Sequence, residues 1–339
     1  MRVKIAIVNS KSFGKYSNAI EELKQYGEVI KKDLPKDIDG MRLAEELKQV
    51  NFVIASSTPR YDAYFFNNNK SVVAILVHGI GLDNIDVRSA TEEGVVVAKV
   101  PGPIEREAVA ELTIGLLLNV LRNITPASIK VREGKWADRA KYVGSELMNK
   151  TVGVIGVGNI GSRVAEILKN GFNVRILAYD PYIPPEKISN MGLKPASFDE
   201  LLQESDIITI HCPLTKETYH MLDETAFKKM KDGVIIINTA RGAIIDTSAL
   251  INALEEGKVK AAALDVVEEE PVDPTNPLLR FENVLITPHI GAYTFEALIG
   301  MDTVLVEAVK ALLKGEAPDN VVNKEVFDRP NLRLKVCFK

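Results

Sequence analysis

The stretch Thr151-Val-Gly-Val-Ile-Gly-Val-Gly-Asn-Ile-Gly161 decides the fold of this chain. It predicts a buried strand, a glycine turn and the start of a helix. Gly156, Gly158 and Gly161 have the spacing G-x-G-x-x-G. In a dinucleotide site the first glycine permits a tight turn, the second lets the backbone approach a pyrophosphate, and the third lets the helix pack on the strand.

The surroundings of this turn have the pattern of a nucleotide-binding unit. Apolar residues continue at helical spacing after the turn, and the apolar run 174–178 predicts a second strand. The backbone amides that open the helix, at Asn159 and Ile160, would face the phosphate charge. Asp180 ends the second strand, where a carboxylate can hold the ribose hydroxyls of a dinucleotide. We therefore predict a dinucleotide site here.

Composition limits the class of protein. The chain has 339 residues, 46% of them hydrophobic and 26% charged, which is enough for two globular domains. A formal net charge of −4 argues against a nucleic-acid partner. No signal peptide is evident at 1–8 and no apolar run approaches the ~18 residues of a membrane span. Cys212 and Cys337 have no metal-ligand spacing, so we expect free thiols, no metal and a cytoplasmic location.

The first hundred residues alternate apolar runs with helical patterns. Strands are predicted at 3–8, 52–55, 72–76 and 95–98, so this part is expected to form a small α/β domain with a parallel sheet. Pro101-Gly-Pro103 is a predicted hinge, and a long, largely apolar helix is predicted at 104–121.

The βα alternation resumes at Thr151 and continues with predicted strands at 207–210, 234–237, 261–264 and 284–286. A helix is predicted from about Phe295 to Leu313, and Gly315 ends it. The tail 332–339 alternates apolar and cationic residues, which favours an exposed strand, with a disordered basic tail as the alternative.

Three of the predicted strands end in residues suited to chemistry. Arg241 follows one strand, the acidic run 268–270 follows the next, and His289 follows the last. In an open α/β sheet such residues meet at one edge. Arg241 could bind a substrate carboxylate and His289 could exchange a proton with a substrate oxygen, assisted by a neighbouring glutamate. With a nicotinamide cofactor, these groups suit the reduction of a 2-keto acid.

The other histidines need separate interpretations. His211 and His220 flank Pro213-Leu-Thr215 and are predicted to be structural. His78 lies in Val77-His-Gly-Ile-Gly-Leu-Asp-Asn84, a loop whose glycines would let a ligand approach bare backbone, and its role stays open.

The chain resembles the D-isomer-specific 2-hydroxyacid dehydrogenase family over nearly its whole length. The residues that carry the resemblance are ordered motifs at the spacing of that family: 78–86, 106–111, 144–147, 151–161, 180–182, 211–215, 238–242, 264–266 with Glu270-Pro271, and 288–292.

The resemblance implies a fold of two Rossmann-like or flavodoxin-like α/β domains with parallel sheets, separated by a cleft. Residues 1–100 and 293–339 would form a discontinuous substrate-binding domain, and 101–292 an inserted NAD-binding domain. The family is usually dimeric through the latter, so a homodimer is expected.

The resemblance also implies roles for individual residues. Arg241, Glu270 and His289 would be the catalytic set, with Glu270 chosen because the glutamate of the family pattern precedes proline. The backbone of His78, Gly79 and Ile80 would bind the substrate carboxylate. The residues that match cofactor contacts beyond the glycine turn and Asp180 are Cys212, Thr239, Ala240, Asp265, Gly291 and Ala292.

Several functions remain open within and beyond this family. Within the family, the sequence is most similar in character to the short form of D-3-phosphoglycerate dehydrogenase. Those enzymes have a phosphate-binding arginine just after the second predicted strand. This protein has Ala55-Ser-Ser-Thr58 there, and Arg60 is displaced by several residues. A glyoxylate or hydroxypyruvate reductase is the alternative enzyme. Formate dehydrogenase is disfavoured because Glu270 stands where that branch has glutamine. The alternative of another class is a non-catalytic NAD(H)-sensing protein similar to corepressors on this scaffold.

Overall fold

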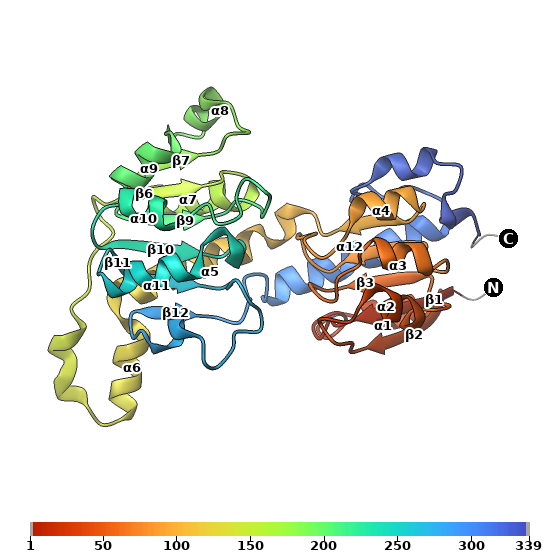
Figure 1. The fold of residues 1–339 in the computed structure, drawn as a ribbon, viewed down its shortest axis with the longest axis horizontal. Coiled ribbons are helices and arrows are strands. Elements are labelled where there is room, and N and C mark those ends of the chain that lie inside the picture. The colour runs from red at the N-terminus through yellow and green to blue at the C-terminus, as the bar shows by residue number, and fades with distance from the viewer. Residues whose placement is uncertain (1–2, 337–339) are drawn as a thin grey trace. The chain divides into compact units, whose positions relative to one another are not determined.

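The structure is a computed structural model that describes residues 3–336 (Figure 1). The protein consists of two compact units, which we call unit 1 (Met1–Glu105 with Tyr293–Lys339) and unit 2 (Arg106–Ala292). Cys337, expected to be a free thiol, lies outside the described residues together with the end of the predicted tail strand.

Unit 1 is built on a five-stranded parallel sheet. Its strands are β1 Val3–Val8, β2 Gly27–Lys32, β3 Phe52–Ala55, β4 Ala74–Val77 and β5 Val96–Lys99. The spatial order is β2-β1-β3-β4-β5, the flavodoxin-like order that was expected. Strands β1, β3 and β4 are buried along almost their whole length, which explains their continuous apolar runs.

Helices cover the sheet of unit 1. They are α1 Ala19–Lys24, α2 Gly40–Glu46, α3 Ala63–Asn68, α4 Val87–Glu92 and α12 Phe295–Leu313. Leu43 of α2 and Phe65 of α3 pack with the side chains of β1, β3 and β4 in one core. The long helix α12 contacts α1 and β4 (Figure 1). The predicted helix at 295–313 is confirmed, and α12 therefore returns the chain to the unit that holds its N-terminal strands.

The tail of the chain differs from the expected strand. Lys324–Asp328 and Arg333–Val336 form short 3-10 helices, η4 and η5. Arg333 is buried, pairs with Glu93 and donates hydrogen bonds to backbone carbonyls between 66 and 72. The predicted exposed strand is wrong at 333–336. Arg333, taken as a solvent-facing cation of that strand, is instead buried and hydrogen-bonded inside unit 1.

Unit 2 contains a seven-stranded parallel sheet. Its strands are β6 Thr151–Ile155, β7 Arg175–Tyr179, β8 Lys194–Pro195, β9 Ile207–Ile210, β10 Val234–Asn238, β11 Val259–Leu264 and β12 Val284–Ile286. Their order, β12-β11-β10-β9-β6-β7-β8, is the doubly wound order in which the chain reverses direction beside β6. The predicted Rossmann fold of this part is confirmed, and β6 carries the glycine turn at the reversal.

Two helical layers enclose the sheet of unit 2. On one face α5 Gly102–Arg122 and α7 Asn159–Phe172 pack on β6, β7 and β10. On the other face lie α9 Phe198–Glu204, α10 Glu224–Lys229 and α11 Thr247–Glu255. The smaller elements are α6 Ile124–Arg132, η1 Trp136–Tyr142, α8 Pro185–Asn190, η2 Gly242–Ile244 and η3 Pro277–Arg280.

Helix α5 confirms the long apolar helix predicted at 104–121. Within residues 3–336 no helix taken singly has the length and apolar character to cross a membrane. Helices α5 and α6 satisfy that criterion as a pair, but they are bent by 65° at the break between them. Side chains of α5 such as Leu117 and Leu121 belong to the core of unit 2.

Candidate active site

The glycine turn has the geometry that a diphosphate requires. Gly156 has φ +84°, and a Cβ there would lie 2.8 Å from the Cys212 nitrogen. A Cβ on Gly161 would lie 1.9 Å from the Gly156 oxygen. Gly158 is the N-cap of α7, makes no side-chain cap bond and has nothing within 4 Å of its Cβ position. The first amides of α7 are thus open to an anion, and the turn fits a dinucleotide.

Asp180 is joined to this turn from the end of β7. Its Oδ2 accepts a hydrogen bond from the Val157 nitrogen (3.1 Å) and its Oδ1 from the Tyr182 nitrogen (3.0 Å). The Gly156 nitrogen donates to the Tyr179 oxygen (2.8 Å), which ties the turn to β7. A carboxylate held at this place can accept bonds from ribose hydroxyls, whereas its charge opposes a 2′-phosphate.

His289 and Glu270 form a close pair in unit 2. The Nδ1 of His289 lies 2.7 Å from the Glu270 Oε2, and the two side chains are 42% and 35% exposed. The hydrogen bond with Glu270 raises the pKa of His289, while burial and the charge of Arg241 oppose that rise. The imidazole is therefore biased toward its protonated form while remaining open to a ligand.

Asp265 holds the loop that carries His289. Its carboxylate is buried and accepts hydrogen bonds from the Thr287 hydroxyl (2.6 Å), the Ile290 nitrogen (2.9 Å) and the Gly291 nitrogen (2.7 Å). The His289 nitrogen donates to the Asp265 backbone oxygen (2.9 Å). His289 has φ +52°, an uncommon conformation for a non-glycine residue, so this network fixes an otherwise unfavourable backbone.

Arg241 follows β10 in a turn that Asn238 stabilises. The buried Asn238 donates from Nδ2 to the Arg241 oxygen (2.8 Å) and accepts from the Ala240 nitrogen at Oδ1 (2.9 Å). The Arg241 Nη1 donates to the Ala240 oxygen (2.7 Å). Thr239 in the same turn lies 2.9 Å from the Thr113 hydroxyl of α5. Because β10, β11 and β12 are neighbours, this turn, Asp265 and His289 share one edge of the sheet.

His211 and Cys212 follow β9, the strand between β10 and β6 in the sheet. Cys212 is half-buried, and burial raises the pKa of its thiol to about 11, so it is not a reactive thiolate. Burial lowers the pKa of His211 to about 3, and its Nε2 lies 2.8 Å from the Thr209 hydroxyl. His211 is therefore a neutral structural residue, as predicted.

A second histidine–glutamate pair was not foreseen. The Nε2 of His220 lies 2.6 Å from Glu268 Oε1, and the Thr247 hydroxyl donates to Glu268 Oε2 (2.7 Å). Although burial acts in the opposite direction, the bonds from Thr247 and His220 hold the pKa of Glu268 below its ordinary value. Of the acidic run 268–270, Glu268 thus pairs with His220, Glu270 with His289, and Glu269 is exposed. Spacing alone could not separate the three: the resemblance singled out Glu270, and the pairing of Glu268 with His220 appears only in the tertiary contacts.

The His78 loop belongs to unit 1, at the end of β4. Its backbone is held by three hydrogen bonds: the His78 nitrogen to the Ala55 oxygen (2.8 Å), the Val100 nitrogen to the Gly79 oxygen (3.1 Å), and the Lys99 Nζ to the Ile80 oxygen (3.2 Å). Within residues 3–336 no atom accepts a hydrogen bond from the Gly79 or Ile80 nitrogen. The side chain of His78 is turned inward and almost completely buried, so this residue can meet a ligand only through its backbone.

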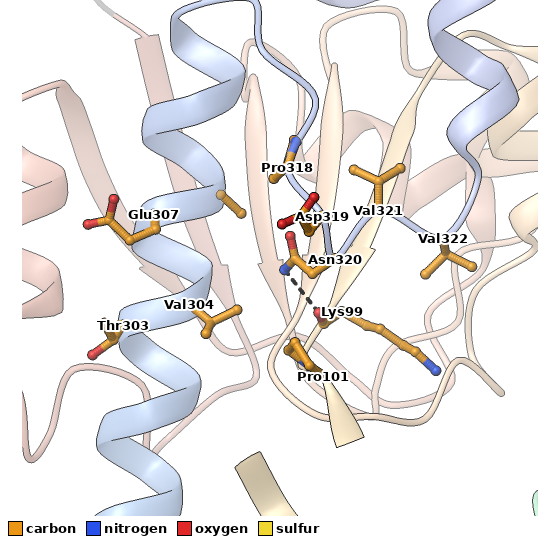
Figure 2. A pocket seen from close by; sticks show the side chains of 11 residues that line it. Lys99, Pro101, Thr303, Val304, Glu307, Pro318, Asp319, Asn320, Val321 and Val322 are labelled. Carbon is orange, nitrogen blue, oxygen red and sulfur yellow. Dashed lines mark hydrogen bonds between the residues drawn. The ribbon is translucent and has the colours of Figure 1, made fainter. Parts of the chain in front are cut away.

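A cavity of about 610 Å³ lies elsewhere in unit 1, between α12, the end of β5 and residues 318–322 (Figure 2). Its walls are mainly apolar. Figure 2 shows Asn320 bonded to the backbone oxygen of Lys99, while the Lys99 amine points away from α12. The cavity contains none of the predicted catalytic residues.

Comparison with known proteins agrees with this geometry. Residues 114–291 match the family model "D-isomer specific 2-hydroxyacid dehydrogenase, NAD binding domain". The chain is 41% identical to a D-3-phosphoglycerate dehydrogenase of Archaeoglobus fulgidus over 87% of its length, although it spans only 56% of that relative. It is 39% identical to a glyoxylate reductase of Thermococcus litoralis, over 91% of this chain and 95% of that one.

Solved structures give the same result. The D-lactate dehydrogenase of Aquifex aeolicus, solved with NAD and lactic acid, is 31% identical, with a TM-score of 0.83 over 94% of this chain and 98% of that one. The expected family is confirmed by the model match and by these relatives. The chain belongs to the D-isomer specific 2-hydroxyacid dehydrogenases and carries their NAD binding domain.

Proposed function

We propose that this protein is an NAD-dependent oxidoreductase that interconverts a D-2-hydroxy acid and its 2-keto acid. The observation that carries the proposal is the 2.7 Å contact between His289 and Glu270, on the sheet edge that also bears Arg241. The glycine turn and Asp180 would hold the dinucleotide, and Thr239, Ala240, Asp265, Gly291 and Ala292 would line its nicotinamide end.

Each catalytic side chain has a distinct task in this proposal. NADH, when bound, supplies the hydride for the carbonyl carbon. His289 donates its proton to the carbonyl oxygen during reduction and accepts one from the hydroxyl during oxidation. Glu270 stabilises the protonated imidazole, and Arg241 binds the substrate carboxylate through its planar guanidinium. In unit 1, the amides of Gly79 and Ile80 would bind a substrate carboxylate.

The substrate we place first is a small unphosphorylated 2-keto acid such as glyoxylate or hydroxypyruvate. Ser56, Ser57 and Thr58 follow β3 where a phosphate-binding arginine would be expected. Arg60 stands beyond this place in the sequence and is exposed. Because the expected arginine is replaced at the strand end, 3-phosphoglycerate is the second candidate.

The decisive experiment measures NADH oxidation with glyoxylate, hydroxypyruvate, pyruvate and phosphohydroxypyruvate. We expect turnover with at least one, and the order of kcat/KM names the substrate. Tight NADH binding without turnover of any of the four would overturn the enzyme proposal and favour an NAD(H)-sensing protein.

The cofactor preference has its own test. Asp180→Ala should reduce the preference for NAD over NADP by roughly 10- to 100-fold, because it removes charge-assisted bonds to the ribose and the repulsion of a 2′-phosphate. The preference is measured as the ratio of kcat/KM values for the two cofactors. An unchanged ratio would refute the role of Asp180.

We also propose that the protein is a cytoplasmic homodimer without nucleic-acid or membrane partners. The segment 123–143 of unit 2, with α6 and η1, extends away from the sheet of that unit (Figure 1). It exposes large apolar side chains, among them Ile124, Ile129, Val131 and Trp136, the last 70% exposed. Such a patch is typical of a protein interface. Light scattering of the wild type and of Trp136→Glu tests it, with a dimer and a monomer expected.

A further inference from the structure

A buried polar cluster in unit 1 has no part in the proposed chemistry. The side chains of His78 and Asp302 are 3% and 1% exposed, and the His78 Nε2 lies 3.0 Å from Asp302 Oδ1. The Ser10 hydroxyl lies 3.2 Å from the His78 Nδ1. The Phe13 ring meets the imidazole edge-on, with centroids 5.3 Å apart. Segments distant in the sequence, the loop after β1, the loop after β4 and helix α12, thus converge on one imidazole.

The carboxylate of Asp302 is bound on its other oxygen as well. Its Oδ2 accepts hydrogen bonds from the Gly14 nitrogen (3.0 Å) and the Ser17 hydroxyl (2.6 Å). Ser10 Oγ accepts from the Phe13 nitrogen (3.2 Å), which leaves its proton for the imidazole. In an Nε2–H tautomer, His78 would accept from Ser10 at Nδ1 and hold its ring N–H beside Asp302 Oδ1, a close contact that lacks the alignment of a hydrogen bond.

The buried cluster is covalently continuous with the loop that carries the free Gly79 and Ile80 amides. His78 is the first residue of this loop, and Gly79 follows with φ +156° and nothing within 4 Å of its Cβ position. The backbone oxygens of the loop are held by Val100 and Lys99. On the side of the loop that faces the interior of unit 1, the His78 imidazole holds the loop in place. Moving the imidazole away from Asp302 would leave the buried Oδ1 of that carboxylate without its neighbour, while Gly14 and Ser17 bind only Oδ2, and uncovering a buried charged atom in this way is unfavourable.

We propose that His78 and Asp302 are a positioning pair that fixes the Gly79 and Ile80 amides in the orientation that binds the carboxylate of a 2-keto acid. This inference rests on the proposed function. Neither side chain touches the substrate in it. Their effect is exerted through the backbone, because a shift of about 1 Å in a binding group can cost roughly 100-fold in rate or affinity.

The test compares His78→Leu and Asp302→Asn with Arg333→Met. Arg333 is another buried charged anchor of unit 1, but it bonds near the start of β4 rather than at its end. In the first two variants we expect the KM of the preferred 2-keto acid to rise between about 10- and 100-fold while kcat changes little. Arg333→Met should lower thermal stability without changing that KM.

A conservative variant and a second measurement complete the design. His78→Gln keeps an N–H near the Nε2 position and should recover most of the affinity lost in His78→Leu. Hydrogen–deuterium exchange of the peptide 78–82 should accelerate in His78→Leu and Asp302→Asn, and much less in Arg333→Met. This measurement needs no substrate, so it tests the pair even if the wild type reduces none of the four acids.

Two results would overturn the inference. One is a KM that is unchanged in His78→Leu and Asp302→Asn, or that shifts equally in Arg333→Met. The other is exchange at 78–82 that does not distinguish the three variants. A wild type that binds NADH but reduces no 2-keto acid would instead refute the proposed function alone.

Discussion

Two of the histidine–carboxylate pairs described above, one in each unit, have similar geometry in very different surroundings. His289 and Glu270 in unit 2 are 2.7 Å apart and more than a third exposed, whereas His78 and Asp302 in unit 1 are 3.0 Å apart and almost completely buried. Solvent and ligand can reach the first pair, and its imidazole can exchange a proton. The second is enclosed by Phe13, Ser10 and the backbone of Gly14, so it can only hold its neighbours in place. The surroundings of the two pairs, rather than their residue types, support the proposed proton transfer for the first pair and the proposed positioning role for the second.

The largest difference should appear when the exposed imidazole is removed. His289→Ala should lower kcat by roughly 10²–10⁴, because the proton transfer loses its donor. Steady-state kinetics of NADH oxidation measure the loss. A change confined to KM would show that His289 binds the substrate without transferring a proton.

The free energy of unfolding should be affected in the opposite order: loss of a carboxylate from the buried pair should cost more than loss of one from the exposed pair. Asp302→Ala takes away the acceptor of the half-buried Gly14 nitrogen and Ser17 hydroxyl and the neighbour of the buried His78 Nε2, and we expect it to lower the free energy of unfolding by about 1–3 kcal/mol. Glu270→Ala removes a partly exposed partner and should cost less than about 1 kcal/mol. Denaturant titrations followed by circular dichroism compare the two. Equal losses would mean that the difference in burial has no energetic consequence.

Glu270→Gln should shift the pH dependence of reduction. The bond to Glu270 raises the pKa of His289, and reduction needs the protonated imidazole, so the rate is present at low pH and lost as pH rises through that pKa. Without the carboxylate the loss should begin at lower pH, and above the midpoint the rate should fall about tenfold for every pH unit by which the midpoint moves down. The pH profile of kcat/KM is the measurement. An unchanged midpoint in Glu270→Gln would show that Glu270 does not raise the pKa of the group that controls the rate.

The sequence predicted what is encoded locally. The glycine turn, most of the apolar strands of both sheets and helix α12 follow from short patterns, and so does the position of His289 just after strand β12. Strand β2 was missed because it lies at the edge of its sheet and ends in Lys31 and Lys32, which interrupt the apolar pattern. The side-chain pairings depend on tertiary contacts. The spacing of these residues in the sequence does not predict that Glu268 pairs with His220. It does not predict that His78 lies beside Asp302 either.

The smallest effect is expected for His220→Ala, which is the control for His289. The pair of His220 and Glu268 is as close as the proposed catalytic pair, at 2.6 Å, and lies in the same unit. Glu268 also accepts hydrogen bonds from the nitrogen and hydroxyl of Thr247 at the start of α11, so it keeps partners when the imidazole is lost. We therefore expect kcat to change less than about threefold and stability by less than about 1 kcal/mol. The same kinetic assay and denaturant titration apply. A loss comparable to that of His289→Ala would show that the nearness of a histidine to a glutamate does not identify the proton donor, and the catalytic role would then have to be assigned anew between the two pairs.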